Sequence, residues 1–151
     1  MPNWLPTLDG IVQWLVEGIQ VADVGCGHGY STLMMAEEFP NSRFHGFDTQ
    51  TASIEAARKH AEAAGGRQTG GVCPSRRDDL FRRQYGLVCF FDVPHDLGDP
   101  VDAARHVAKV LAPGGTVMLV EPFAHDHTAD NLSATGQLYY AASTRPRHPS
   151  T

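Results

Sequence analysis

Short apolar runs recur along the chain and alternate with stretches whose apolar residues have helical spacing. Residues 19–24, 43–48, 87–92 and 116–121 have the length and composition of buried β-strands. The run LVCFFD at 87–92 is almost continuously apolar, as expected for a parallel strand that is buried on both faces. The pattern therefore predicts strands of a buried sheet at these four places.

Helices are predicted in the segments that connect these strands. Residues 31–39 have helix-compatible apolar spacing, and residues 51–64 are rich in alanine and followed by two glycines. Asp99 and Pro100 supply a cap and a first-turn proline for another helix. We expect this helix to end at residues 113–115, Pro-Gly-Gly.

A short amphipathic helix is also expected before the first strand, with Thr7 or Asp9 as its cap and Gly18 at its end. Strands and helices thus alternate along most of the chain. This order predicts an α/β fold, a doubly wound parallel sheet with right-handed crossovers.

One segment breaks the alternation. Residues 66–85 hold glycines, a proline and five of the twelve basic residues where a third strand is due, and only Val72 and Cys73 could pair. No aromatic platform accompanies the arginines, so they indicate a solvated loop rather than a nucleic-acid site. We expect residues 66–85 to be irregular, with a third strand that is weak or missing. A change of reading frame in the coding sequence is one hypothesis for this composition and for that of the tail.

The first strand runs directly into three glycines at alternate positions, in the sequence VADVGCGHG at residues 21–29. Glycines let the backbone approach a ligand closely, and the helix that follows places its N-terminus beside the ligand. Dinucleotide folds use G-x-G-x-x-G/A, but the last of these positions is Tyr30 here. Asp48 ends the next strand about 20 residues later, where an acid can accept both ribose hydroxyls. The turn is therefore shaped for a nucleotide without a pyrophosphate.

Length and composition limit the other possibilities. A chain of 151 residues suits one domain, and no apolar run approaches the roughly 20 residues of a membrane helix. No secretory signal is recognisable, so a cytoplasmic location is expected. The net charge of −5 argues against general nucleic-acid affinity. The three widely spaced cysteines indicate no zinc site, and His125-Asp126-His127 reads as a polar loop without a third ligand, so no metal is expected.

The G-x-G-x-G turn after an acidic residue resembles motif I of the class I S-adenosylmethionine-dependent methyltransferases. The likeness extends over residues 4–143, and particularly to a bacterial subgroup with a winged-helix-type domain in front of the core. The stretches that carry it are VADVGCGHG, FHGFD at 44–48, LVCFFDVPHDLGDP at 87–100, LAPGGTVMLVEPF at 111–123 and DNLSATGQLYYAAS at 130–143.

The resemblance implies roles for particular residues. His95, in a His-Asp pair after the fourth strand, is implied to be the catalytic base that removes the acceptor's hydroxyl proton, while a hydrated or capping loop histidine remains the alternative. S-adenosyl-L-methionine is implied as the cofactor, with Asp48 on its ribose and the glycine turn at its methionine part. The full implied set of cofactor-binding residues is Asp23, Gly25, Cys26, Gly27, Gly29, Asp48, Phe91 and Asp92.

The resemblance also implies a Rossmann-like sheet in the order 3-2-1-4-5. We expect a cofactor-binding domain over residues 1–143 and a disordered tail over 144–151, without the family's winged-helix domain or its C-terminal antiparallel hairpin. The strand at 116–121 would then be an uncovered edge through which the chain could self-associate.

Methyl transfer from S-adenosylmethionine to a small organic acceptor is the expected activity, impaired if the chain is truncated. A degenerate, non-catalytic fragment that still binds the cofactor is an alternative. An NAD-type oxidoreductase is another, and it would need Tyr30 to be tolerated at the close-packing position.

Overall fold

The chain folds into two compact units, Met1–Val120 and Glu121–Thr151. The computed structural model describes residues 4–65, 75–76, 80, 83–94 and 97–143. The first unit contains the sheet, and the described part of the second contains a 3-10 turn and a helix. The single domain expected over residues 1–143 stays a prediction.

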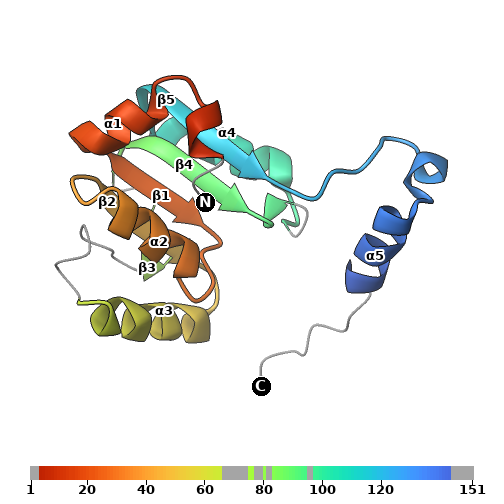
Figure 1. Cartoon of the computed structure of the whole chain (residues 1–151), viewed down its shortest axis with the longest axis horizontal. Helices are drawn as coiled ribbons and strands as arrows, with labels where there is room; N and C mark the ends of the chain where they lie inside the picture. The colour runs from red at the N-terminus through yellow and green to blue at the C-terminus, as the bar shows by residue number, and fades with distance from the viewer. Residues whose placement is uncertain (1–3, 66–74, 77–79, 81–82, 95–96, 144–151) are drawn as a thin grey trace. The chain divides into compact units, whose positions relative to one another are not determined.

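A parallel sheet forms the centre of the first unit, in the order β3-β2-β1-β4-β5. The expected α/β class and strand order are confirmed. The arrowheads of β1, β4 and β5 point toward the same edge in Figure 1. The elements of the unit are η1 (Leu5–Thr7), α1 (Ile11–Glu17), β1 (Gln20–Val24), α2 (Tyr30–Glu38), β2 (Arg43–Asp48), α3 (Thr51–Ala63), β3 (Ser75–Arg76), β4 (Tyr85–Phe91), α4 (Pro100–Val110) and β5 (Leu111–Val120).

The register brings the ends of three strands to the same level. Val24, the last residue of β1, pairs with Phe47 of β2 on one side and with Phe90 of β4 on the other. The loops that follow these strands therefore leave the sheet together. In an open parallel sheet this carboxyl edge is where ligands bind.

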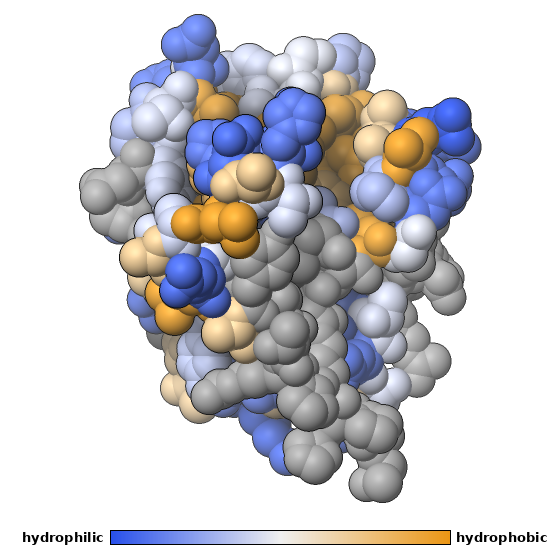
Figure 2. All heavy atoms as spheres, turned by 90° about the vertical axis from the view of Figure 1, so that its right-hand side faces the viewer, coloured by the Kyte–Doolittle hydropathy of each residue, from blue (hydrophilic) through white to orange (hydrophobic). Residues whose placement is uncertain are grey.

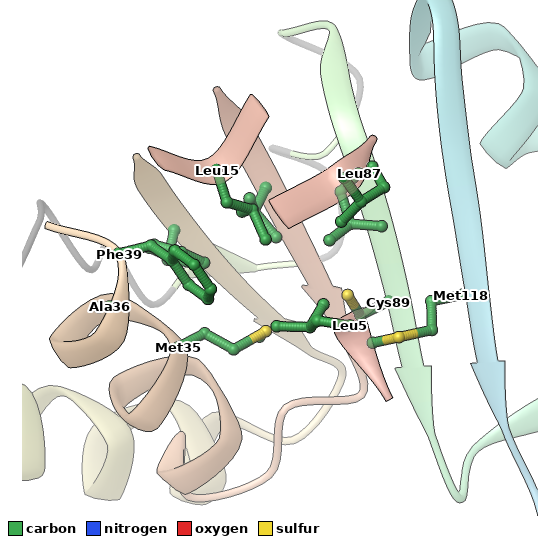
Figure 3. Close-up of a cluster of buried hydrophobic side chains, with 11 residues drawn as sticks. Leu5, Leu15, Met35, Ala36, Phe39, Leu87, Cys89 and Met118 are labelled. Carbon is green, nitrogen blue, oxygen red and sulfur yellow. The ribbon is translucent and has the colours of Figure 1, made fainter. Parts of the chain in front are cut away.

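Side chains of alternate strand residues enter two separate cores, one on each face of the sheet. One core joins η1, α1 and α2 to the sheet, and Figure 3 shows Leu15 and Met35 from these helices gathered with Leu87 and Cys89 of β4. The other core places Val107 and other α4 residues against the opposite face. The near-continuous apolar run in β4 is explained by burial on both faces.

The boundary between α4 and β5 differs from the predicted one. The helix ends at Val110, and β5 begins at Leu111 and continues through the Pro-Gly-Gly segment. The pairing with β4 is irregular here, because Tyr85 pairs with Leu111 whereas Leu87 pairs with Thr116. The glycines thus accommodate an irregularity inside a strand instead of ending a helix.

Helix capping was predicted correctly at α4 and wrongly at α1. The Asp99 carboxylate accepts a hydrogen bond from the Asp102 N–H at 2.8 Å, as its position before Pro100 suggested. The N-cap of α1 is instead Gly10, in the left-handed conformation, and no side chain caps it. Thr7 is not free to cap this helix because it belongs to η1, where its hydroxyl donates to the Trp4 carbonyl.

The segment expected to be irregular contributes a two-residue strand. Ser75 and Arg76 pair with Phe47 and Asp48 at the end of β2. Val72 and Cys73, which the sequence suggested for this strand, lie outside the described residues, as does most of this segment.

The second unit contains η5 (Thr128–Asn131) and α5 (Ala134–Ser143). Asn131 closes the loop before η5, because its amide accepts from the His125 N–H and donates to the carbonyls of His125 and His127. Within the described residues, no three histidine, cysteine or acidic side chains are grouped as metal ligands.

Figure 2 shows hydrophobic patches separated by hydrophilic residues on the drawn face.

His45 of β2 is a buried histidine with a clear consequence for pH stability. Burial, together with the charges of Arg83 and Arg43, lowers its pKa from 6.5 to about 4, and its Nε2 donates to the Gln20 amide oxygen at 2.7 Å. Between these two values the unfolded chain binds more protons than the folded chain, so acid favours unfolding.

We therefore expect protonation of His45 to lower the free energy of unfolding by on the order of 2 kcal/mol as the pH falls from about 6.5 to 4. Urea unfolding at successive pH values measures this loss, and the slope should become shallower in His45→Gln. The amide introduced by His45→Gln can still donate to Gln20, so the two proteins differ chiefly in the ionisable ring. An unchanged slope in His45→Gln would contradict the assignment.

Candidate functional site

The glycine turn between β1 and α2 is held by backbone hydrogen bonds to the neighbouring strand. The N–H groups of Gly25 and Cys26 both donate to the Phe47 carbonyl, at 2.7 and 3.0 Å. Gly29 then donates to the Cys26 carbonyl at 2.9 Å, which closes the turn. The turn is consequently fixed to the end of β2 before any ligand enters.

The three glycines of the turn all have a positive φ, but a side chain would meet different surroundings at each of them. A Cβ on Gly25 would lie 2.5 Å from Val93 Cγ2, in the loop after β4. A Cβ on Gly29 would lie 3.0 Å from Ala57 Cβ of α3. A Cβ on Gly27 would meet no atom within 4 Å. Gly25 and Gly29 thus allow close packing within the protein, whereas Gly27 faces open space that a ligand can use.

Asp48 ties the turn to the end of β2. Its Oδ2 accepts a hydrogen bond from the Gly27 N–H at 3.0 Å, and its Oδ1 accepts from the Gln50 N–H at 2.8 Å. Each carboxylate oxygen has a second lone pair, so both atoms can still accept hydroxyl groups from a ligand. The Asp48 carboxylate can therefore hold the glycine turn and bind a sugar at the same time.

Asp23 lies under the turn and is only 1% exposed. Its Oδ2 accepts hydrogen bonds from the hydroxyls of Ser31 and Thr32, both at 2.6 Å. Burial raises the pKa of this carboxyl, the two hydroxyls lower it, and the nearby charge of Asp48 raises it further. The structure thus surrounds Asp23 with protein donors from α2.

The two described cysteines are unreactive thiols. Burial, reinforced by the charges of Asp23 and Asp48, raises the pKa of Cys26 to about 12. Burial likewise raises the pKa of Cys89. Both remain protonated near neutral pH, so neither provides a thiolate nucleophile.

Helix α3 supports the glycine turn from outside. The Nδ1 of His60 donates to the His28 carbonyl at 2.9 Å, since a carbonyl oxygen can only accept. The Tyr30 ring packs on His60, with ring centroids 4.6 Å apart. Tyr30, the residue that departs from the dinucleotide pattern, is thus a largely exposed side chain packed on α3.

The exit of β4 forms the other side of the carboxyl edge. Because Val24 pairs with Phe90, Phe91 follows at the level of Gly25. The Trp4 indole stacks on Phe91 with a centroid distance of 6.0 Å. Asp92 then has a φ of +59°, an uncommon conformation for a residue other than glycine and one found at functional turns. His95 lies outside the described residues.

Several residues that shape this site were not singled out by sequence reasoning. Ser31 and Thr32 give a signal in retrospect, because a buried acid needs donors and these hydroxyls directly follow the turn. Ala57 and Val93 touch the glycines through tertiary contacts that have no local signal. Trp4 likewise meets Phe91 through a tertiary contact.

A parallel sheet in the order 3-2-1-4-5, with a glycine turn after its central strand and an acid after the next, defines a Rossmann-like nucleotide-binding fold. The chain belongs to a methyltransferase family, since the family model described as "Methyltransferase domain" matches residues 22–117.

Two relatives illustrate the likeness at the sequence level. The trans-aconitate 2-methyltransferase of Sinorhizobium fredii is 30% identical over 128 residues, which is 83% of this chain and 44% of that protein. Aklanonic acid methyltransferase DauC of a Streptomyces species is 32% identical over 117 residues, 71% of this chain and 50% of that protein. The chain thus spans about half the length of the curated relatives that it matches.

A solved structure agrees at the level of the fold. A methyltransferase from Thiobacillus denitrificans, solved with S-adenosyl-L-homocysteine, has a TM-score of 0.57 and 22% identity. The match covers 78% of this chain and 48% of that one. Its fold is therefore the fold found here.

Proposed function

We propose that the glycine turn and Asp48 bind S-adenosyl-L-methionine. The observation that carries the proposal is the pairing of an open Gly27 with a carboxylate that holds the same residue. The ribose hydroxyls can donate to the remaining lone pairs of Asp48, while the backbone at Gly27 is accessible to the rest of the ligand. The Thiobacillus denitrificans structure supports the choice because it was solved with the demethylated form of this cofactor.

The charge and shape of the site fit this cofactor. S-adenosylmethionine has a positively charged sulfonium, and the carboxylate of Asp48 lies beside the glycine turn, where it would attract this charge. The ligand has no pyrophosphate, which agrees with a turn that lacks the third small residue of the dinucleotide pattern. Gly25, Cys26, Gly29, Phe91 and Asp92 complete the proposed lining.

We further propose that the chain supports methyl transfer to a small organic acceptor. The cofactor supplies an electrophilic methyl group, and the protein aligns an acceptor oxygen behind it for in-line displacement. The two relatives described above are named for small organic acids, which supports this acceptor class. The acceptor's proton is assigned to His95, after the exit of β4, in the role of general base.

His95→Ala tests the role of that histidine. Turnover is expected to fall by about 100-fold, because general-base catalysis typically contributes a factor of this size. Affinity for S-adenosylhomocysteine should stay unchanged, since the turn and Asp48 are untouched. His125→Ala, in the second unit, is the matched control. Wild-type turnover in His95→Ala would remove this side chain from the mechanism.

A binding fragment without catalysis is the second candidate. It is favoured because the contacts described above hold the glycine turn and Asp48 for a cofactor and position no acceptor. Purified protein that gains thermal stability from S-adenosylhomocysteine but methylates no small acid would support this candidate over the enzyme. An oxidoreductase would instead be stabilised by NAD.

Self-association through β5 is also proposed. In the described sheet β5 is an edge strand, and residues 111–120 carry no charged side chain that would discourage pairing. Leu119 is 60% exposed there. We expect a concentration-dependent dimer in analytical ultracentrifugation, and Leu119→Lys should shift it to monomer. A monomeric wild type at every concentration would exclude this contact.

The remaining expectations concern where the chain acts. None of the helices in the described part of the chain has the length and apolarity needed to span a bilayer. A cytoplasmic location, and an absence of nucleic acid among its partners, remain proposals that rest on the sequence and its net charge of −5. Cell fractionation and a gel-shift assay with duplex DNA test them.

A further inference from the structure

We propose that Asp23 is a positioning residue, which holds the first turn of α2 against β1 so that the glycine turn keeps its ligand-ready shape. This inference rests on the proposed binding of S-adenosylmethionine, and it changes the expected role of Asp23 from a ligand contact to an internal clamp. The clamp is defined as Asp23, Ser31 and Thr32.

The hydrogen bonds of the clamp join the two ends of the glycine turn. Asp23 lies on β1, two residues before Gly25, whereas Ser31 and Thr32 lie in the first turn of α2, just after Gly29. Both hydroxyls donate to the same atom, Asp23 Oδ2, at 2.6 Å. One side chain of the strand therefore fixes where the turn must end.

The start of α2 depends on this clamp because it lacks the usual cap. Its N-cap is Gly29, in the left-handed conformation and without a side chain that could accept from the helix. A Cβ added at Gly29 would lie 3.0 Å from Ala57 Cβ, so there is little space between this residue and α3 for a displaced first turn. Holding Ser31 and Thr32 keeps Gly29 in the narrow space that only glycine can fill.

The strand β2 leaves room for the clamp at one position. Gly46 pairs in register with Asp23, and its φ is not in the left-handed region, so the backbone does not require glycine there. A Cβ at Gly46 would lie 2.8 Å from Cys26 Sγ and 3.1 Å from Thr32 Oγ1. Gly46 is thus required by space, and it protects both the glycine turn and one donor of the clamp.

Four variants test the clamp from different sides. Asp23→Ala removes the acceptor, and Ser31→Ala/Thr32→Val removes both donors. Gly46→Ala crowds Cys26 and Thr32 Oγ1 without changing any clamp residue. Asp23→Asn keeps an oxygen that can accept both hydroxyls. Ser53→Ala, in the first turn of α3, is the matched control for loss of a hydroxyl.

Hydrogen exchange of the amides of residues 25–33 reports on the turn without any ligand, and calorimetry measures the affinity for S-adenosylhomocysteine. We expect faster exchange and about tenfold weaker binding in Asp23→Ala, in Ser31→Ala/Thr32→Val and in Gly46→Ala. Asp23→Asn should rescue both properties to within about threefold. Ser53→Ala should behave as wild type.

The clamp would be overturned by two results together. Asp23→Ala would bind S-adenosylhomocysteine weakly, whereas Ser31→Ala/Thr32→Val would keep wild-type exchange and wild-type affinity. Asp23 would then act on the ligand directly. Failure of Asp23→Asn to rescue either property would overturn it too. If wild type itself binds no S-adenosylhomocysteine, the proposed function fails, and the exchange data still decide whether the clamp holds the turn.

Discussion

Asp48→Ala is expected to weaken S-adenosylhomocysteine binding by about 100-fold, the largest loss of affinity expected from truncating a single side chain of the site. The carboxylate holds the Gly27 N–H and the Gln50 N–H, so its removal loosens the turn and the start of α3 at once. It also removes the acceptor for the ribose hydroxyls. Hydrogen bonds to charged groups contribute roughly 1.5 to 3 kcal/mol each, and the loss of one or two accounts for the expected change. Isothermal titration calorimetry measures it.

Asp99→Ala provides the matched control for a lost carboxylate. Asp99 also accepts one backbone N–H at 2.8 Å, but it caps α4 and touches no part of the glycine turn. The substitution should cost about 1 kcal/mol of unfolding free energy and leave affinity unchanged. Equal affinity losses in the two variants would show that general destabilisation, rather than the ligand contact, explains the effect of Asp48.

Gly25→Ala should have the largest effect on stability, about 3 kcal/mol, and should abolish measurable cofactor binding. The residue has a φ of +76°, which disfavours alanine, and the new Cβ would lie 2.5 Å from Val93 Cγ2. The loop after β4 would have to move away from the turn. Urea unfolding and calorimetry on the same preparation measure the two losses.

Two further variants separate strain from collision. Gly10→Ala imposes alanine at a similar φ of +72° where no atom lies within 4 Å, so it should cost only the backbone strain, about 1 kcal/mol. Val93→Ala in the Gly25→Ala background removes the colliding methyl groups and should restore part of the stability. No gain in the double variant would mean that Val93 does not pack on Gly25 in solution.

The strands β1, β2, β4 and β5 and the glycine turn could be predicted from the sequence because their signals are local, whereas β3 was not placed. The apolar run in β4 specifies a strand buried on both faces whatever the rest of the chain does. The alternation of glycines specifies a tight turn with backbone conformations that favour glycine at these positions. Asp48 could be placed at the carboxyl edge because it ends an alternating strand next to that turn.

Features that depend on contacts between distant segments could not be predicted in this way. The Pro-Gly-Gly segment reads as a helix stop, yet pairing with β4 makes it part of β5. Thr7 reads as a helix cap, yet its own turn already uses its hydroxyl. Ser31 and Thr32 read as ordinary helix residues until the burial of Asp23 shows what they hold. In each case the local sequence allows more than one structural role, and a contact with a distant part of the chain determines which role the residue has.

The most direct measurement of the central claim is an NMR titration of the ¹⁵N-labelled chain with S-adenosylhomocysteine, followed by NAD. Saturable shifts are predicted at the amides of Gly25, Gly27, Gly29 and Gln50 with the first ligand, and none with NAD. No shift of these amides at millimolar S-adenosylhomocysteine, or saturation by NAD instead, would contradict the account.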